Sequence, residues 1–255
     1  MIRSNMDGDW SKVFFSDSAA GIPHLVKEVI HVWCLPLDLP PQEQARNFSL
    51  LSPDEKARSE KFYFKKARDH FIAGRGFLRT LLGVYLNLDP TLLQFSYEQQ
   101  GKPVLKEDSL GWPIQFNVSH SEGLGVLAFC LDHRVGVDIE YLRPLADFND
   151  LARMVFTTKE STMISALSGE DKQELFYKIW TCKEAHYKAL GAGLQIPMDK
   201  VGVKFKADGD GVLISSDGVE INNWQLHLFN PRTNYQCAVC VEGGNMEVVF
   251  QPSEH

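Results

Sequence analysis

Residues 134–145 read RVGVDIEYLRPL, and this segment decides the fold because a similar order of elements stands on each side of it. Before it, the sequence predicts a strand at residues 29–35, then helices, then further strands. After the strand at residues 135–140, it again predicts helices and then, at residues 202–249, several antiparallel strands of alternating pattern. We therefore expect an α+β protein of two similar halves, residues 1–134 and residues 135–255, with a ligand cleft at the seam.

Helix start signals occur in both halves. Residues 52–55 and residues 157–160 each form a capping box, in which a Ser or Thr is followed three positions later by Glu. Longer helices are predicted at residues 66–86 and residues 171–190 from the spacing of their apolar side chains. Residues 1–24 are polar and irregular, and we expect them to form a loose extension.

The composition is that of a globular protein. Hydrophobic residues make up 44% of the chain and charged residues 23%, which argues against disorder. The net charge of −7 does not favour nucleic acid as a partner, although a local basic patch in an acidic protein still binds anionic small molecules. No signal-peptide pattern and no apolar run of bilayer length is present, so no membrane association is expected.

The chain has five cysteines, and an odd number fits a reducing, cytoplasmic setting. Cys237 and Cys240 have the spacing of a metal-binding pair. No second Cys or His pair lies nearby, and the surrounding residues predict a buried strand. We therefore expect these two thiols to be structural.

Two carboxylates lie on one face of the predicted strand at residues 135–140. Side chains alternate along a strand, so Asp138 and Glu140 share a face while Val137 and Ile139 point to the core. Their Cα atoms are roughly 7 Å apart, and the two charges repel unless a cation lies between them. Oxygen ligands of this kind suit Mg²⁺. In isolation, a strand with a solvated acidic face is the more common explanation.

The helix at residues 171–190 carries a second charged pair. Glu184 and Lys188 are four positions apart and lie on one helix face. The functional interpretation is that Glu184 reaches the same cation or acts as a base, while Lys188 neutralises phosphate. The simpler interpretation is a surface salt bridge of small energy.

The segment Phe116-Asn-Val-Ser-His-Ser121 is an apolar strand that ends in hydroxyl and imidazole groups. Such groups hydrogen-bond phosphate, but a β-turn with a satisfied histidine explains the same residues. Basic residues also occur on the first two helices and in the turn Gly101-Lys102-Pro103.

Taken in order, these segments resemble one family closely, the phosphopantetheinyl transferases of the type that activates surfactin synthetase. The resemblance rests on Ser52-Pro-Asp-Glu-Lys-Ala-Arg58, Gly101-Lys-Pro103, Phe116 to Ser121, Gly136-Val-Asp-Ile-Glu140, and Trp180-x-x-Lys-Glu-x-x-x-Lys188-x-x-Gly191. It runs from about residue 50 to about residue 200. It implies a monomer with pseudo-two-fold symmetry, and coenzyme A bound between the halves.

The resemblance also implies the roles of individual residues. Asp138, Glu140 and Glu184 match the Mg²⁺ ligands, and Lys188 matches a phosphate contact. The nucleotide end of coenzyme A is implied to lie against the positions of Arg58, Gly101, Lys102, Pro103, Asn117, Ser119 and His120. Some relatives carry a further basic residue where this chain has Glu55.

The implied reaction moves the 4′-phosphopantetheine arm of coenzyme A onto a serine of an acyl, polyketide or peptidyl carrier protein and releases adenosine 3′,5′-bisphosphate. Mg²⁺ and Lys188 neutralise the pyrophosphate, Asp138 holds the metal, and Glu184 is the candidate base. Two other functions use the same residues: a Mg²⁺-dependent nucleotide pyrophosphatase, and a scaffold that binds coenzyme A or a carrier without catalysis.

The surface that meets the carrier protein is less clear from the sequence. Carrier domains are usually acidic around the serine, so a docking surface should offer apolar and basic groups. Residues 141–156, with Arg143 and Arg153, fit this description. A loop that only links the two halves explains the same segment equally well.

Overall fold

The computed structural model describes residues 22–98, 101–106, 113–144, 148–191, 197–207, 211–215 and 218–251. It is an α+β fold, as the sequence predicts. The first part of the chain contains five strands, of which β2 and β3 form a hairpin, and three α-helices. In chain order the elements are β1 (Val29–Pro36), α2 (Pro41–Leu50), α3 (Pro53–Ser59), α4 (Lys65–Leu86), the 3₁₀ helix η1 (Pro90–Leu92), β2 (Phe95–Tyr97), β3 (Pro103–Leu105), β4 (Ile114–Ser121) and β5 (Leu124–Leu131).

The second part repeats this order of one strand, helices, a 3₁₀ helix and strands. Its elements are β6 (Val135–Tyr141), α5 (Phe148–Val155), α6 (Thr158–Ser165), α7 (Gly169–Leu190), η3 (Met198–Lys200), β7 (Val201–Phe205), β8 (Gly211–Ser215), β9 (Trp224–Phe229), β10 (Tyr235–Glu242) and β11 (Glu247–Gln251). Both capping boxes form, and α7 ends at Gly191 in the left-handed conformation.

Two main sheets result, with strand orders β11-β1-β5-β4 and β6-β10-β9-β8-β7. β1 pairs with β5 in one half as β6 pairs with β10 in the other, so the two halves have matching topology. The last strand departs from the antiparallel tail that the sequence predicts. β11 returns to the first sheet and pairs parallel to β1. The boundary between residues 134 and 135 stays a prediction.

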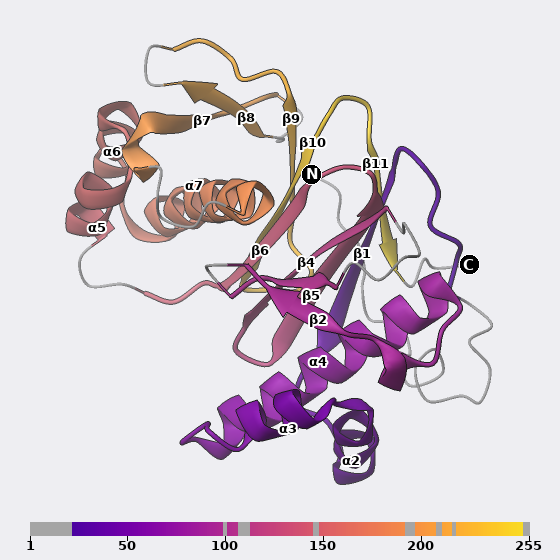
Figure 1. Cartoon of the computed structure of the whole chain (residues 1–255). Coiled ribbons are helices and arrows are strands. Elements are labelled where there is room, and N and C mark those ends of the chain that lie inside the picture. The colour runs from indigo at the N-terminus through magenta and orange to yellow at the C-terminus, as the bar shows by residue number, and fades with distance from the viewer. Residues whose placement is uncertain are drawn as a thin grey trace.

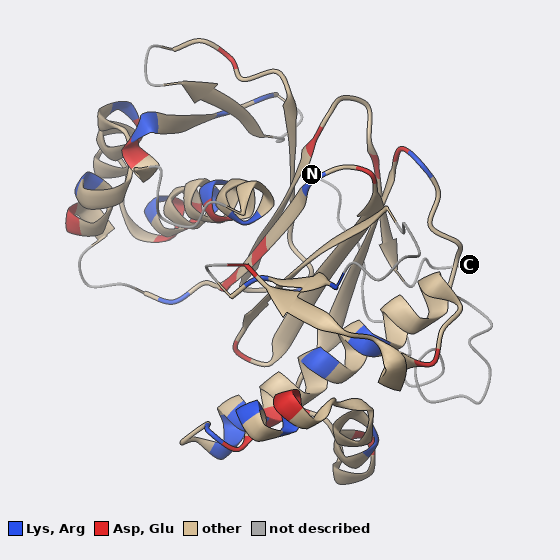
Figure 2. Cartoon of the chain, viewed as in Figure 1, with Lys and Arg blue, Asp and Glu red and all other residues tan. Residues whose placement is uncertain are grey.

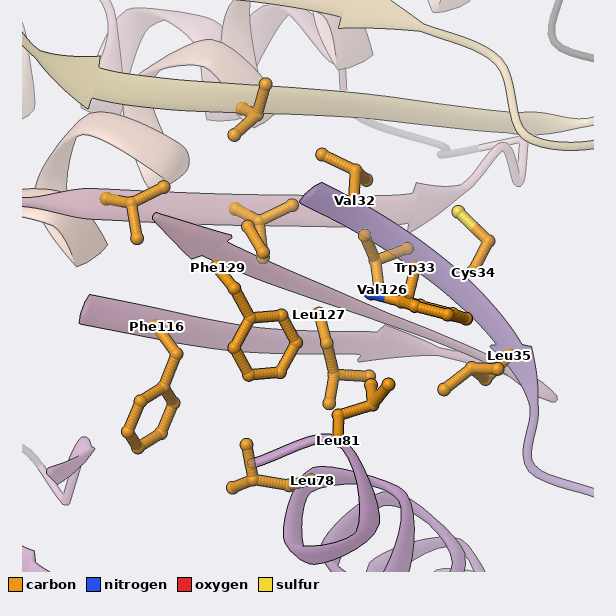
Figure 3. Close-up of a cluster of buried hydrophobic side chains, with 14 of the residues drawn as sticks. Val32, Trp33, Cys34, Leu35, Leu78, Leu81, Phe116, Val126, Leu127 and Phe129 are labelled. Atoms are coloured by element: carbon orange, nitrogen blue, oxygen red, sulfur yellow. The ribbon is translucent and has the colours of Figure 1, made fainter. Parts of the chain in front are cut away.

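The two sheets face each other across a shared apolar core, and a long helix covers the outer face of each (Figure 1). Leu78 and Leu81 of α4 lie under Leu127 and Phe129 of β5, as Figure 3 shows. On the other side, α7 packs its small residues against Ala238 and Cys240 of β10, in a second apolar cluster. No helix among the described residues combines the length and apolar character needed to cross a membrane.

The sheets meet edge to edge at β4 and β6. Side chains of β4 accept hydrogen bonds from backbone N–H groups of β6: Asn117 Oδ1 from Val137 at 2.9 Å and Ser121 Oγ from Tyr141 at 3.0 Å. Polar side chains therefore satisfy the outer edge of β6, which would otherwise be left unpaired. This seam is where the candidate site lies.

Candidate active site

Asp138 is the most buried carboxylate of the seam, with 4% of its surface exposed. Its Oδ1 accepts hydrogen bonds from Lys188 Nζ at 2.7 Å and from Ser119 Oγ at 3.1 Å. Its Oδ2 is buried and has no hydrogen-bond partner. Burial raises the pKa of Asp138, although Lys188 and Ser119 act in the opposite direction. The free oxygen gives this carboxylate a remaining capacity for a cation or a donor.

Lys188 reaches Asp138 because α7 lies very close to β6. A Cβ atom on Gly136 would stand 2.0 Å from the carbonyl oxygen of Ala185, so only glycine fits at this position of the strand. Lys188 Nζ also donates to Ser119 Oγ at 2.8 Å. The three side chains Lys188, Asp138 and Ser119 thus form one hydrogen-bonded group from α7, β6 and β4.

Glu140 and Glu184 lie beside this group and are both half-buried. Glu140 accepts from Trp180 Nε1 at 3.1 Å and from Ser121 Oγ at 3.4 Å. Burial raises the pKa of Glu140 and of Glu184, and repulsion from Asp138 raises each further. The negative charges of these three carboxylates repel one another, so a bound cation would stabilise their ionised forms.

The carboxylates are nevertheless not arranged as a finished metal centre. Among the described residues, no group of three or more His, Cys, Asp or Glu side chains converges closely enough to hold an ion. The sequence brings Asp138, Glu140 and Glu184 to one place, with Lys188 on Asp138 Oδ1. Their roles as metal ligands stay a prediction.

The turn at residues 101–103 meets the site from the other half. Lys102 Nζ donates to the carbonyl oxygen of Lys188 at 3.0 Å, near the C-terminal end of α7. Gly101 has φ of +79°, a conformation that favours glycine, and Pro103 begins β3. The ammonium of Lys102 also suits the negative end of the helix dipole. This contact fixes the turn relative to Lys188.

Arg58 lies on α3 and is exposed. Its guanidinium stands 5.5 Å from the ring centroids of Phe71 and of Tyr97. Tyr97 ends the strand β2 that pairs with Pro103. The structure therefore brings the exposed Arg58 to the same hairpin as the predicted turn.

Asn117 and His120 differ in their availability. The side-chain oxygen of Asn117 is occupied by the backbone of β6, so Asn117 joins the two sheets. His120 is exposed on β4, one residue beyond Ser119. Its placement leaves it open to a ligand, whereas Asn117 has only its amide nitrogen to offer.

Two residues at the site were not predicted as site residues, Trp180 and Ser121. Both hydrogen-bond Glu140. Trp180 lies one helical turn before Glu184 on the same face of α7, which is a signal that helical spacing contains. Ser121 lies two strand residues beyond Ser119, so it shares a face with it.

The segment at residues 141–156 is placed only in part. Residues 145–147 lie outside the described residues, and α5 covers most of the remainder. Arg143 pairs with Glu122, and Arg153 pairs with Asp150 on its own helix. Its role as a docking surface or as a linker stays a prediction.

Comparison with known proteins identifies the family. Residues 134–240 match the model of the 4′-phosphopantetheinyl transferase superfamily, and residues 40–131 match the model described as 4′-phosphopantetheinyl transferase, N-terminal. The 4′-phosphopantetheinyl transferase HetI of Nostoc sp. (strain PCC 7120) is 36% identical over 89% of this chain and 93% of its own length. The chain belongs to the 4′-phosphopantetheinyl transferase superfamily.

Other 4′-phosphopantetheinyl transferases match a similar span. The putative 4′-phosphopantetheinyl transferase slr0495 of Synechocystis sp. is 36% identical over 67% of this chain and 68% of its own length. The 4′-phosphopantetheinyl transferase Sfp of Bacillus subtilis (strain 168) is 28% identical over 78% of this chain and 85% of its own length. The family that the sequence motifs predict is confirmed.

Proposed function

We propose that this protein transfers the 4′-phosphopantetheine arm of coenzyme A to a serine of a carrier protein and releases adenosine 3′,5′-bisphosphate. The observation that carries the proposal is the group formed by Lys188, Asp138 and Ser119 at the seam, with Glu140 and Glu184 beside it, in a chain of this family. In this group an ammonium suited to bind phosphate lies beside carboxylates suited to bind a metal ion and to accept a proton.

Lys188 is the residue that we expect to neutralise the pyrophosphate of coenzyme A. Its ammonium is held by Asp138 and Ser119, so it is oriented before a substrate arrives. Lys102 is close to the same helix end and adds positive charge there. Lowering the negative charge on phosphate lets the serine hydroxyl approach the β-phosphorus, and charge on the leaving bisphosphate is stabilised.

Glu184 is our candidate for the base that takes the serine proton. Burial and the neighbouring carboxylates raise the pKa of Glu184, which moves it toward the range in which a carboxylate accepts a proton efficiently near neutral pH. The phosphorus–oxygen bond to the bisphosphate breaks as the bond to the serine oxygen forms. No covalent enzyme intermediate is needed.

The donor chemistry of the seam fits Mg²⁺. Asp138 and Glu140 supply carboxylate oxygens, and Glu184 supplies a third when it acts as a ligand and not as the base. The unpartnered Oδ2 of Asp138 is a buried polar atom that a cation would satisfy. When bound, Mg²⁺ would neutralise pyrophosphate charge. Lys188, Ser119 and Trp180 keep Asp138 and Glu140 in place through the hydrogen bonds described above.

For the nucleotide end of coenzyme A, we propose Arg58, the turn Gly101-Lys102-Pro103 and His120. The support is that Arg58 lies 5.5 Å from the ring centroid of Tyr97, in the same hairpin as the turn, and that the exposed His120 directly follows Ser119. Ser119 connects this region to Lys188. We keep Asn117 as a positioning residue between the sheets.

We also propose that the protein acts in the cytoplasm as a monomer, without nucleic acid or membrane partners. The five cysteines, all among the described residues, are buried and form no disulfide, which suits a reducing compartment. A monomer is supported by the contacts among Lys188, Asp138 and Ser119, which all belong to one chain. The net charge of −7 does not favour nucleic acid.

Intact-mass analysis of an apo carrier protein tests the proposed function. The carrier is incubated with this protein, coenzyme A and Mg²⁺, and a parallel sample contains EDTA. We expect a mass gain of one phosphopantetheine arm that EDTA abolishes. No gain on acyl, polyketide or peptidyl carriers would contradict the proposal, and a gain that EDTA leaves unchanged would contradict the metal assignment.

A further inference from the structure

An exposed aromatic segment joins α3 to α4. Residues 61–68 are all exposed, and Tyr63 and Phe64 expose 92% and 70% of their surface. The rings of Tyr63 and Phe64 stand edge to face with their centroids 5.0 Å apart. Phe62 packs against Phe71 at 5.3 Å and anchors the segment. Adjacent large apolar side chains in this state are typical of an interaction surface.

The same segment lies in a stretch of the chain that is rich in basic residues. Residues 56–68 contain six basic residues and one acidic residue, in a protein whose net charge is −7. In Figure 2 the ribbon is coloured blue for Lys and Arg at several positions near the N-terminal end of α4. We call Lys61, Phe62, Tyr63, Phe64, Lys65 and Lys66 the aromatic tip. Its composition suits a partner whose surface is acidic and partly apolar.

The aromatic tip connects to the proposed active site by short contacts. Lys66 Nζ lies 3.2 Å from Glu122 Oε2, and Glu122 also pairs with Arg143. Glu122 directly follows Ser121, whose hydroxyl donates to Glu140. The aromatic tip and Arg143 therefore stand on either side of the β4–β5 turn, at the edge of the site that the carboxylates define.

We propose that the aromatic tip docks the carrier protein, with Tyr63 and Phe64 as apolar anchors and the lysines facing acidic residues around the carrier's serine. This inference rests on the proposed function, because the second substrate of that reaction is a folded domain whose serine must reach the seam. A surface that is apolar, basic and adjacent to the seam meets both requirements.

The test uses the full chain with the double substitution Tyr63→Gln and Phe64→Ser. Both residues are exposed, and Ser is a favoured residue at the N-cap position that Phe64 occupies without a side-chain cap, so the fold should persist. The matched control is Leu92→Ser, since Leu92 is 69% exposed in the same half. The readouts are KM for an apo carrier at saturating coenzyme A, kcat, and the Kd of coenzyme A by calorimetry.

We expect the double variant, which removes both apolar anchors, to raise KM for the carrier at least about tenfold. The Kd of coenzyme A should not change, and Leu92→Ser should match the wild type. Lys61→Glu should raise the same KM at low salt more than Lys159→Glu on α6, with the difference shrinking as salt rises. A double variant with the carrier KM of Leu92→Ser overturns the docking proposal.

Two further outcomes separate the alternatives. If the wild-type protein binds vesicles of phosphatidylcholine and phosphatidylserine, and the double variant loses that binding with unchanged carrier KM, the aromatic tip is a membrane contact and the docking proposal is wrong. If the wild-type protein transfers no arm to any carrier, the proposed function itself fails. If the wild-type protein transfers the arm and the double variant keeps the wild-type carrier KM, only the docking proposal is overturned.

Discussion

Each half contains a buried ion pair between the Glu of its capping box and a basic residue of its long helix, and we call this ion pair the brace. In the first half, Glu55 of the capping box accepts a hydrogen bond from Arg79 at 2.7 Å. In the second, Glu160 of the capping box accepts one from Lys183, also at 2.7 Å. Arg79 and Lys183 are fully buried, and each is the fifteenth residue of its 22-residue helix, α4 or α7.

Each cation of the brace also ties its helix to the following 3₁₀ helix. Arg79 donates to the carbonyl oxygen of Pro90 at 2.8 Å, and Lys183 donates to that of Met198 at 2.9 Å. The brace thus fixes a long helix against a short helix on one side and a 3₁₀ helix on the other. Lys183 is therefore structural, although it lies next to Glu184 in the sequence.

The halves differ on the strand face that meets the long helix. In the first half His31 and Trp33 of β1 both hydrogen-bond the Tyr85 hydroxyl of α4 at 2.9 Å. In the second half Asp138 of β6 accepts a hydrogen bond from Lys188 of α7. The comparison teaches that one scaffold serves both halves, and that the proposed chemistry depends on the few residues by which this face differs in the second half.

The largest expected effect comes from breaking the brace. Lys183→Ala leaves the buried Glu160 without a cationic partner. Arg79→Ala removes the cation from Oε2 of the buried Glu55, while Arg75 stays 3.5 Å from Oε1. Each should lower the free energy of unfolding by about 3–5 kcal/mol. Urea denaturation followed by circular dichroism measures this. Only Lys183→Ala should also lower kcat, because α7 carries Lys188.

The outcome that would refute the comparison is a Lys183→Ala protein of normal stability that no longer binds coenzyme A. Lys183 would then be a ligand and not a brace. Similar losses of stability in both variants would support the matching of the two halves. Isothermal calorimetry with coenzyme A on each folded variant separates the two results.

A smaller effect is expected where α7 approaches β6. Gly136→Ala places a methyl group into the backbone of α7, which must shift at a cost of about 1–3 kcal/mol. The shift separates Lys188 from Asp138 and should reduce kcat at least tenfold. The matched control is Gly74→Ala in α4, where the nearest atom is 3.9 Å from the added methyl group. That change should keep or raise stability. Equal activity in both variants would show that the close approach is not needed for the site.

The overall architecture could be predicted from the sequence because it depends on local patterns. Helix starts follow from the two capping boxes, and the alternation at β6 places Asp138 and Glu140 on one face. The parallel return of β11 to β1 could not be predicted, since pairing between distant strands leaves no local signal. The same holds for the brace, whose partners are more than twenty residues apart.

The candidate site was predicted in its carboxylates but not in its hydrogen bonds. Asp138, Glu140, Glu184 and Lys188 have helical or strand spacing that reveals a shared face. Asn117 Oδ1 accepts a hydrogen bond from the backbone of β6 because two sheet edges meet there. The spacing of residues along the sequence does not reveal where sheet edges meet. Trp180 and Ser121 differ from Asn117 in this respect, because their spacing from Glu184 and Ser119 does place them on the same faces.

The smallest expected effect is the change in melting temperature caused by Glu184→Gln, whose sign depends on the burial of Glu184. Burial raises the pKa of Glu184 above its ordinary value, so its ionised form destabilises the fold and its contribution to stability falls as pH rises through the raised pKa. Glu184→Gln should therefore melt slightly higher than the wild type at neutral pH, and the difference should vanish in acid, below the ordinary pKa of Glu. Glu160→Gln should melt lower, because Glu160 pairs with Lys183. Thermal melts across pH compare them, and equal signs for both variants would refute the account of Glu184.

The most direct test of the central claim compares Asp138→Asn with Trp33→Phe, which change equivalent faces of the two halves. We predict that Asp138→Asn keeps a melting temperature close to that of the wild type and loses at least ~10²-fold in kcat/KM for carrier modification. Trp33→Phe should melt lower, because it removes a buried hydrogen bond to Tyr85, and keep kcat/KM within about threefold when folded. Near-normal turnover by Asp138→Asn, measured by intact mass of the carrier over time, would contradict the assignment of the chemistry to β6 and α7.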